Sequence, residues 1–167
     1  MKIDGTAYRT IWVNADGWSV DIIDQTRLPH ALVTVTLSSL EDAAEAIGTM
    51  LVRGAPLIGA TAAYGLALAM RADPSDSALA AAHARLLATR PTAVNLRWAL
   101  DDLSAVLANT PPERRVAAAY RRAAELCDED VAMNSAIGDH GLPLIQRIAK
   151  DKAARGSEGP VNVLTHC

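Results

Sequence analysis

Residues 55–70 read APLIGATAAYGLALAM, an apolar stretch that Arg53 and Arg71 flank. The stretch is shorter than the ~20 apolar residues that a bilayer-spanning helix needs. Its apolar residues fall on every side of a helix, which is typical of a helix enclosed in a protein core. We therefore predict a buried central helix in a soluble protein that does not enter a membrane.

The composition is that of a folded domain. Of the 167 residues, 50% are hydrophobic and 21% are charged, and the net charge is −3. These values argue against a disordered chain and give no indication of a nucleic-acid partner. No cysteine or histidine spacing predicts a metal site, and the first residues contain no apolar signal segment. We expect a cytoplasmic protein with free thiols and no metal.

The first 37 residues have the pattern of a small β-sheet. Alternating apolar and polar runs at residues 9–14 and 18–24 flank Asp16-Gly17. Asp-Gly between two such runs predicts a hairpin, because both turn residues tolerate positive φ. A third β-rich run follows at residues 31–37. We expect an antiparallel sheet made of a hairpin and a third strand.

From Ser38 to about Ala153 the pattern is helical, and Gly or Pro residues mark the breaks. Ser38-Ser39-Leu40-Glu41 has the pattern of a capping box, in which a serine accepts an amide and the glutamate reaches back. We predict helices at residues 39–51, 56–72, 76–89, 93–108, 113–133 and 135–153, of which the last two can form one helix. The predicted fold class is α+β, with a sheet followed by an all-helical bundle in one domain, residues 1–153.

Residues 154–160 are small, polar and rich in glycine, which is typical of a linker. A strand-like run, VNVLT, then leads to His166 and Cys167. A single strand cannot satisfy its own backbone hydrogen bonds. We therefore expect residues 161–167 to be the first strand of a truncated second domain.

The central helix is preceded by Arg53-Gly54-Ala55-Pro56. Proline suits the first helical position, and Gly54 allows a ligand to approach the backbone closely. An exposed helix N-terminus beside a guanidinium has the outline of a phosphate site. An ordinary turn with a solvated arginine has the same pattern, and the spacing leaves both interpretations open.

The pattern recurs at Arg90-Pro91-Thr92, where Thr92 can cap the next helix and Arg90 stands just outside it. The two arginines can converge on one anion or belong to two unrelated loops. The sequence alone leaves this choice open as well.

Cys167 ends the predicted strand, and ligands of open parallel sheets bind beyond the carboxyl ends of strands. A thiol there can act as an acid, a base or a nucleophile if its pKa is lowered, and the alternative is a small buried residue. We assign Cys127 to packing and Asp139-His140 to a helix surface or an interface. Asp24 can orient the turn that follows it or a substrate, and the structural role is favoured. Paired charges are interpreted as solvated faces: Asp101-Asp102, Arg114-Arg115 and Arg121-Arg122.

Five motifs in series resemble the methylthioribose-1-phosphate isomerase family. They lie at residues 24–29, 52–65, 90–96, 136–141 and 164–167. The resemblance implies an enzyme that converts 5-methylthioribose 1-phosphate to 5-methylthioribulose 1-phosphate in methionine salvage, without a cofactor. It also implies a homodimer with a Rossmann-like C-terminal domain.

The resemblance assigns substrate binding to Arg53, Gly54, Ala55 and Arg90, and catalysis to Cys167. The family's catalytic aspartate would lie beyond residue 167, so we expect the 167-residue chain alone to be inactive. Two related families remain as alternatives, the ribose-1,5-bisphosphate isomerases and the non-catalytic regulatory subunits of translation-initiation exchange factor 2B. The motif at residues 24–29 favours the methylthioribose enzyme over the first, and the intact Arg53 loop with Cys167 argues against the second.

Overall fold

The computed structural model describes residues 2–3, 5–157 and 159–165. The chain forms two compact units, Met1–Cys127 and Asp128–Cys167, and helix α5 (Pro112–Ala154) runs through the boundary between them. The predicted domain boundary after residue 153 stays a prediction.

The first unit contains the sheet that the hairpin pattern predicts. Its strands are β3 (Ile11–Val13), β4 (Val20–Ile23) and β5 (Thr34–Leu37), all antiparallel in the order β3-β4-β5. Val20 is fully buried and lies opposite Leu37, so one face of the sheet enters the core. The hairpin and the third strand are therefore confirmed.

The hairpin turn is stabilised by a carboxylate. Asp16 Oδ1 accepts hydrogen bonds from the backbone N–H groups of Trp18 and Ser19, both at 2.9 Å. Gly17 has φ 80°, which a glycine adopts without steric cost. A second pair of strands, β1 (Lys2–Ile3) and β2 (Thr6–Ala7), was not predicted, because two-residue strands leave no periodic pattern in a sequence.

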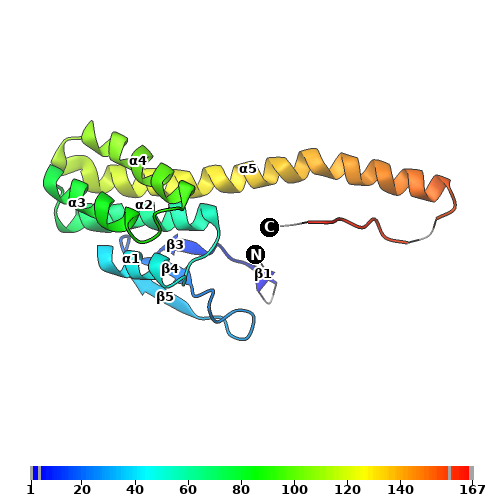
Figure 1. Ribbon diagram of the computed structural model, residues 1–167, viewed down its shortest axis with the longest axis horizontal. Helices are drawn as coiled ribbons and strands as arrows, with labels where there is room; N and C mark the ends of the chain where they lie inside the picture. Colours follow the sequence, from blue (N-terminus) through cyan, green and yellow to red (C-terminus); the bar gives the residue numbers. More distant parts are fainter. Residues whose placement is uncertain (1, 4, 158, 166–167) are drawn as a thin grey trace. The chain divides into compact units, whose positions relative to one another are not determined.

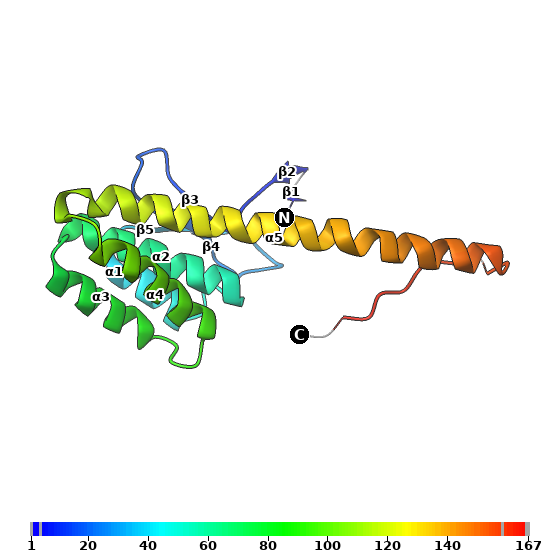
Figure 2. The same ribbon diagram turned by 90° about the horizontal axis from the view of Figure 1, so that it is seen from above.

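Four helices surround the core of the first unit together with the start of α5. They are α1 (Leu40–Gly48), α2 (Ala55–Ala72), α3 (Asp76–Leu87) and α4 (Val94–Ala108). Every residue of α2 from Leu57 to Met70 is buried, as the apolar stretch predicts. Helix α2 contacts α1, α3, α4 and β3, and in Figure 1 the sheet and α1 lie below it and α4 above it. Figure 2 shows α3 and α4 side by side.

Small residues let the helices approach α2 closely. A Cβ added at Gly59 would lie 3.1 Å from the carbonyl oxygen of Asn95 in α4. One added at Gly65 would lie 2.9 Å from the Cβ of Ala43 in α1. The two glycines thus set the distance of α4 and α1 from the central helix.

The predicted cap of α1 is shifted by one residue. Ser39 caps the helix by accepting from the N–H of Asp42, and the Asp42 carboxylate accepts from the N–H of Ser38 at 2.8 Å. The prediction that Glu41 reaches back was wrong, because the third helical position after Ser39 is Asp42. Glu41 instead pairs with Arg85: its Oε2 atom accepts from Nε at 3.0 Å and from Nη2 at 2.7 Å, and its Oε1 atom accepts from Nε at 3.1 Å.

The last two predicted helices form the single helix α5, with Pro143 inside it. In the unit Asp128–Cys167, the described residues after α5 form no regular secondary structure, and residues 161–165 are not a strand. That residues 161–167 form a strand in a second domain stays a prediction, because a strand is stable only when another strand pairs with it. Within the described part of the chain, no helix has the length and apolarity needed to cross a membrane.

Candidate functional site

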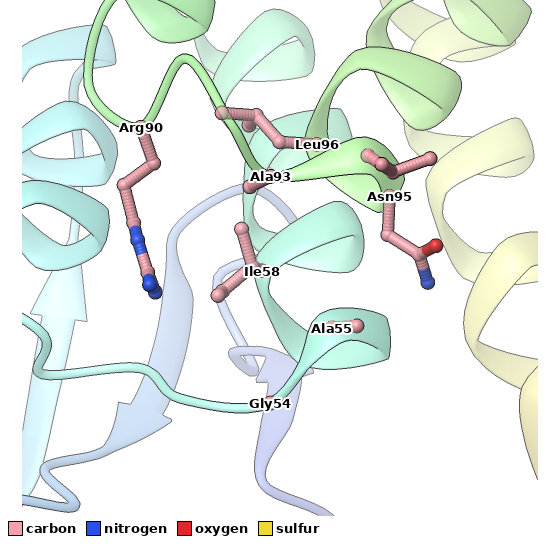
Figure 3. A pocket seen from close by; sticks show the side chains of 8 residues that line it. Gly54, Ala55, Ile58, Arg90, Ala93, Asn95 and Leu96 are labelled. Atoms are coloured by element: carbon pink, nitrogen blue, oxygen red, sulfur yellow. The ribbon is translucent and has the colours of Figure 1, made fainter.

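A pocket of about 300 Å³ lies where α2 and α4 begin. We call it the α2–α4 pocket. It is lined by Gly54, Ala55, Ile58, Arg90, Ala93, Val94, Asn95 and Leu96. The lining thus combines the first turns of two helices with one guanidinium (Figure 3).

Both helices begin without a side-chain cap. Helix α2 starts after Gly54, which has φ 91°, and α4 starts after Ala93. Neither cap residue donates or accepts a side-chain hydrogen bond, and neither first turn contains an acidic residue. The first amides of a helix have no intrahelical acceptor, so the two N-termini present N–H groups and positive dipole ends to a ligand.

The other helices begin differently. Ser39 and Ser75 cap α1 and α3, and both helices have acidic residues in the first turn. Helix α5 has Glu113 in its first turn. In the described part of the chain, the two helix starts with neither a cap nor an acid are therefore the two that meet at the α2–α4 pocket. An anion is the ligand whose charge fits such a site.

Arg90 supplies the positive charge of the pocket. Figure 3 shows its side chain extending from the connection before α4 toward the loop that contains Gly54, with Asn95 on the other side of Ile58. Arg90 is partly exposed, so it is accessible to a ligand without bearing the full desolvation cost of a buried charge.

Of the predicted binding residues, the structure brings Gly54, Ala55 and Arg90 together. Arg53 is exposed and is not among the residues that line the pocket, although it is next to Gly54 in the chain. The prediction that Thr92 caps α4 was wrong, because the helix begins one residue later and Ala93 is its N-cap. Cys167, the predicted catalytic residue, lies outside the described residues.

Sequence reasoning did not single out Asn95 and Ile58 as pocket residues. Asn95 is within the motif at residues 90–96, but its position on the first turn of α4 depends on where that helix starts. Ile58 reaches the pocket because it is one turn after Gly54 in α2. Elsewhere among the described residues, no group of three His, Cys, Asp or Glu side chains has the arrangement of a metal site.

Residues 51–167, more than two thirds of the chain, match the initiation factor 2 subunit family. The chain belongs to this family. The matched segment contains every residue that lines the α2–α4 pocket. The segment that matches the family therefore includes the candidate site.

The relatives of this chain include proteins that match it over its whole length. An uncharacterized protein in the petC 3′ region of Rhodospirillum rubrum is 58% identical, and the match covers 91% of it. The methylthioribose-1-phosphate isomerase of Rhodospirillum centenum is 63% identical, and the match covers 44% of it. The chain thus spans less than half the length of the named isomerase.

Two solved structures of the family have the same fold in this region. The 5-methylthioribose 1-phosphate isomerase of Pyrococcus horikoshii has a TM-score of 0.66 and 36% identity, over 74% of this chain and 36% of that one. The delta subunit of translation initiation factor eIF-2B from A. fulgidus has a TM-score of 0.67 and 36% identity, over 75% of this chain and 38% of that one. An enzyme and a translation factor are equally similar in structure, so the fold does not distinguish them.

Proposed function

We propose that the chain is the phosphate-binding part of an isomerase that converts 5-methylthioribose 1-phosphate to 5-methylthioribulose 1-phosphate. The observation that carries the proposal is the α2–α4 pocket, in which two uncapped helix starts and Arg90 face one space. An identity of 63%, over the whole of this chain, to a protein named as this isomerase supports the choice of substrate.

In this proposal the phosphate group of the substrate accepts hydrogen bonds from the first amides of α2 and α4 and pairs with Arg90. Gly54 gives the phosphate access to the backbone, because glycine has no side chain to cover it. Arg53 would add a second positive charge from the rim, since it is exposed beside Gly54. Fixing the phosphate orients the sugar for the chemical step.

The substrate carries its phosphate on the anomeric carbon, so the sugar cannot open to an aldehyde as an ordinary aldose does. The enzyme must open the ring, retain the phosphate and move hydrogen between C2 and C1. An acid–base pair performs such a transfer. We propose Cys167 as one member and expect the other beyond residue 167. No cofactor is required in this scheme, and the homodimer and the cytoplasmic location stay predictions.

A non-catalytic role as a regulatory subunit is the second candidate, since the eIF-2B delta subunit is a structural neighbour. At 36% identity that neighbour is more distant than the isomerase relative at 63%. The sequence relationship therefore favours the enzyme, and ribose 1,5-bisphosphate is the alternative substrate to test.

A chimera tests the proposal. This chain would replace the matching part of the Rhodospirillum centenum isomerase, and turnover of 5-methylthioribose 1-phosphate and ribose 1,5-bisphosphate would be measured. We expect turnover of the first sugar at a rate close to that of the parent enzyme. A folded chimera that is inactive on both sugars would contradict the enzymatic role, and one that acts only on the bisphosphate would contradict the substrate.

Arg90→Ala in the same chimera should lower kcat/KM by about 10–100-fold, because a charge-assisted hydrogen bond contributes roughly 1.5–3 kcal/mol. Arg53→Ala should have a smaller effect, because Arg53 lies outside the pocket lining. Equal activity of Arg90→Ala and the parent chimera would remove Arg90 from the site.

A further inference from the structure

The turn after β4 is shaped by a buried carboxylate. Asp24 is 7% exposed, and its Oδ1 atom accepts hydrogen bonds from the N–H of Thr26 at 2.9 Å and from its hydroxyl at 2.7 Å. The backbone carbonyl of Asp24 accepts from the N–H of Arg27 at 3.3 Å. Side-chain and backbone bonds together hold residues 24–27 in one conformation.

This turn is connected to the loop that leads into α2. Gln25 lies between the two residues that the carboxylate ties together, and its N–H donates to the carbonyl oxygen of Leu51 at 2.9 Å. The direction of that N–H is therefore set by the Asp24 carboxylate. Leu51 is three residues before Gly54, which lines the α2–α4 pocket.

The loop at residues 49–54 needs support from its surroundings. Met50 has φ 63°, a left-handed conformation that is sterically unfavourable for a residue other than glycine. Such a conformation persists only where neighbouring contacts enforce it. Here Val52 is fully buried, and its N–H donates to the carbonyl of Ala46. The carbonyl of the preceding residue, Leu51, accepts from the N–H of Gln25.

We propose that Asp24 is a positioning residue for the α2–α4 pocket. Through the hydrogen bond between Gln25 and Leu51, it fixes the position of the backbone at Gly54 and Ala55. The inference rests on the proposed anion-binding role of that pocket. Asp24 is not among the residues that line the pocket. It fixes the loop from which the first amides of α2 start, and these amides must face the anion within a few tenths of an ångström to bind it well.

Asp16 provides a matched control at the other end of β4. Its carboxylate also shapes a turn and accepts from Trp18 and Ser19, but among the described residues no hydrogen bond joins that turn to the 49–54 loop. Asp16→Ala and Asp24→Ala both remove a carboxylate that stabilises a turn of the same sheet. Only Asp24→Ala is expected to disturb the pocket.

The test uses the 167-residue chain, inorganic phosphate as the probe, and the amide signals of Gly54 and Ala55 in NMR spectra. We expect Asp24→Ala to shift both signals and to lower phosphate affinity about tenfold. Asp24→Asn retains the acceptor oxygen and should bind within about twofold of the wild-type chain. Thr26→Val, at an exposed position, removes only the hydroxyl donor and should shift the signals in the same direction by less.

Unchanged Gly54 and Ala55 signals in a folded Asp24→Ala variant would overturn the positioning role, as would equal shifts in Asp16→Ala. Affinity that falls equally in Asp24→Asn and Asp24→Ala would do the same. A wild-type chain that does not bind phosphate at all would instead contradict the anion pocket, and the amide shifts would still report on the positioning role.

Discussion

Arg115 stabilises the first unit by satisfying the ends of other elements. Arg115 is only 4% exposed, and its Nε atom lies 3.0 Å from the carbonyl oxygens of Leu107 and Thr110. Nη1 donates to the carbonyl of Pro74 at 2.8 Å, and Nη2 contacts Asp76 Oδ1 at 2.5 Å. The interpretation of Arg114-Arg115 as a solvated pair was wrong for Arg115, because the last carbonyls of α4 need a donor and α5 presents one.

We predict that Arg115→Ala destabilises the chain by about 3 kcal/mol, because it leaves three carbonyl groups without this donor. The Asp76 side chain is 89% exposed, so its pairing with Arg115 is screened by water and contributes less. Asp76→Asn should therefore cost less than Arg115→Ala in urea unfolding. Arg114→Ala, at the exposed neighbour, is the control and should change stability by no more than about 0.5 kcal/mol. A cost in Asp76→Asn as large as in Arg115→Ala would show that the ion pair dominates.

At the scale of elements, α2 packs through its small residues. A Cβ at Gly65 would lie 2.9 Å from Ala43 Cβ and 3.1 Å from Leu86 Cδ1, so Gly65 is enclosed by α1 and α3 at once. Neither neighbour can move without disturbing the fully buried core.

We predict that Gly65→Ala destabilises the chain by about 1–3 kcal/mol, although alanine favours helices more than glycine does. Gly48→Ala in α1 is the matched control, because a Cβ there has no atom within 4 Å. The control should be neutral or stabilising by up to about 1 kcal/mol. Denaturant midpoints at equal m-values measure both changes, and a Gly65→Ala variant as stable as Gly48→Ala would mean that α1 and α3 yield easily.

The elements that the sequence predicts well are those whose signal is local. The Asp16-Gly17 turn and the apolar run of α2 depend on neighbouring residues alone, and both were predicted correctly. The cap of α1 was misplaced by one residue, because Ser38 and Ser39 are equivalent until the start of the helix is known.

The pocket forms through contacts between segments that are distant in the sequence, so the sequence alone could not predict it fully. The sequence marks Gly54 and Arg90 as candidates for anion sites, but their meeting in one pocket depends on how closely α4 packs on α2 at Gly59. Arg53 has the same local pattern as Arg90 and lies outside the lining. A helix-start motif indicates which residues can bind an anion, whereas packing decides which of them share one site.

At the scale of the whole molecule, stability depends on pH, because ionised aspartates stabilise several of the connections in the first unit. A side-chain hydrogen bond from Ser19 lowers the pKa of Asp16, and a backbone hydrogen bond from Ser75 lowers the pKa of Asp73. Burial acts to raise the pKa of Asp42, but hydrogen bonds from Ser38 and Ser39 outweigh it and lower the value. The three groups are in the hairpin turn, the start of α1 and the start of α3.

We predict that the chain loses stability as the pH falls below the ordinary aspartate pKa of 3.8. A carboxyl whose pKa is lower in the folded state stabilises the fold above the unfolded value, and this contribution disappears as the pH falls through the folded value. Asp42→Asn removes the titration while keeping the shape of the side chain. The difference in Tm between the wild-type chain and Asp42→Asn should therefore be constant from about pH 7 to about pH 5. It should shrink as the pH falls from about 4 to about 2, which is within roughly two pH units of the unfolded pKa. A difference that stays constant down to pH 2 would mean that the hydrogen bonds from Ser38 and Ser39 bind the protonated carboxyl as well as the carboxylate.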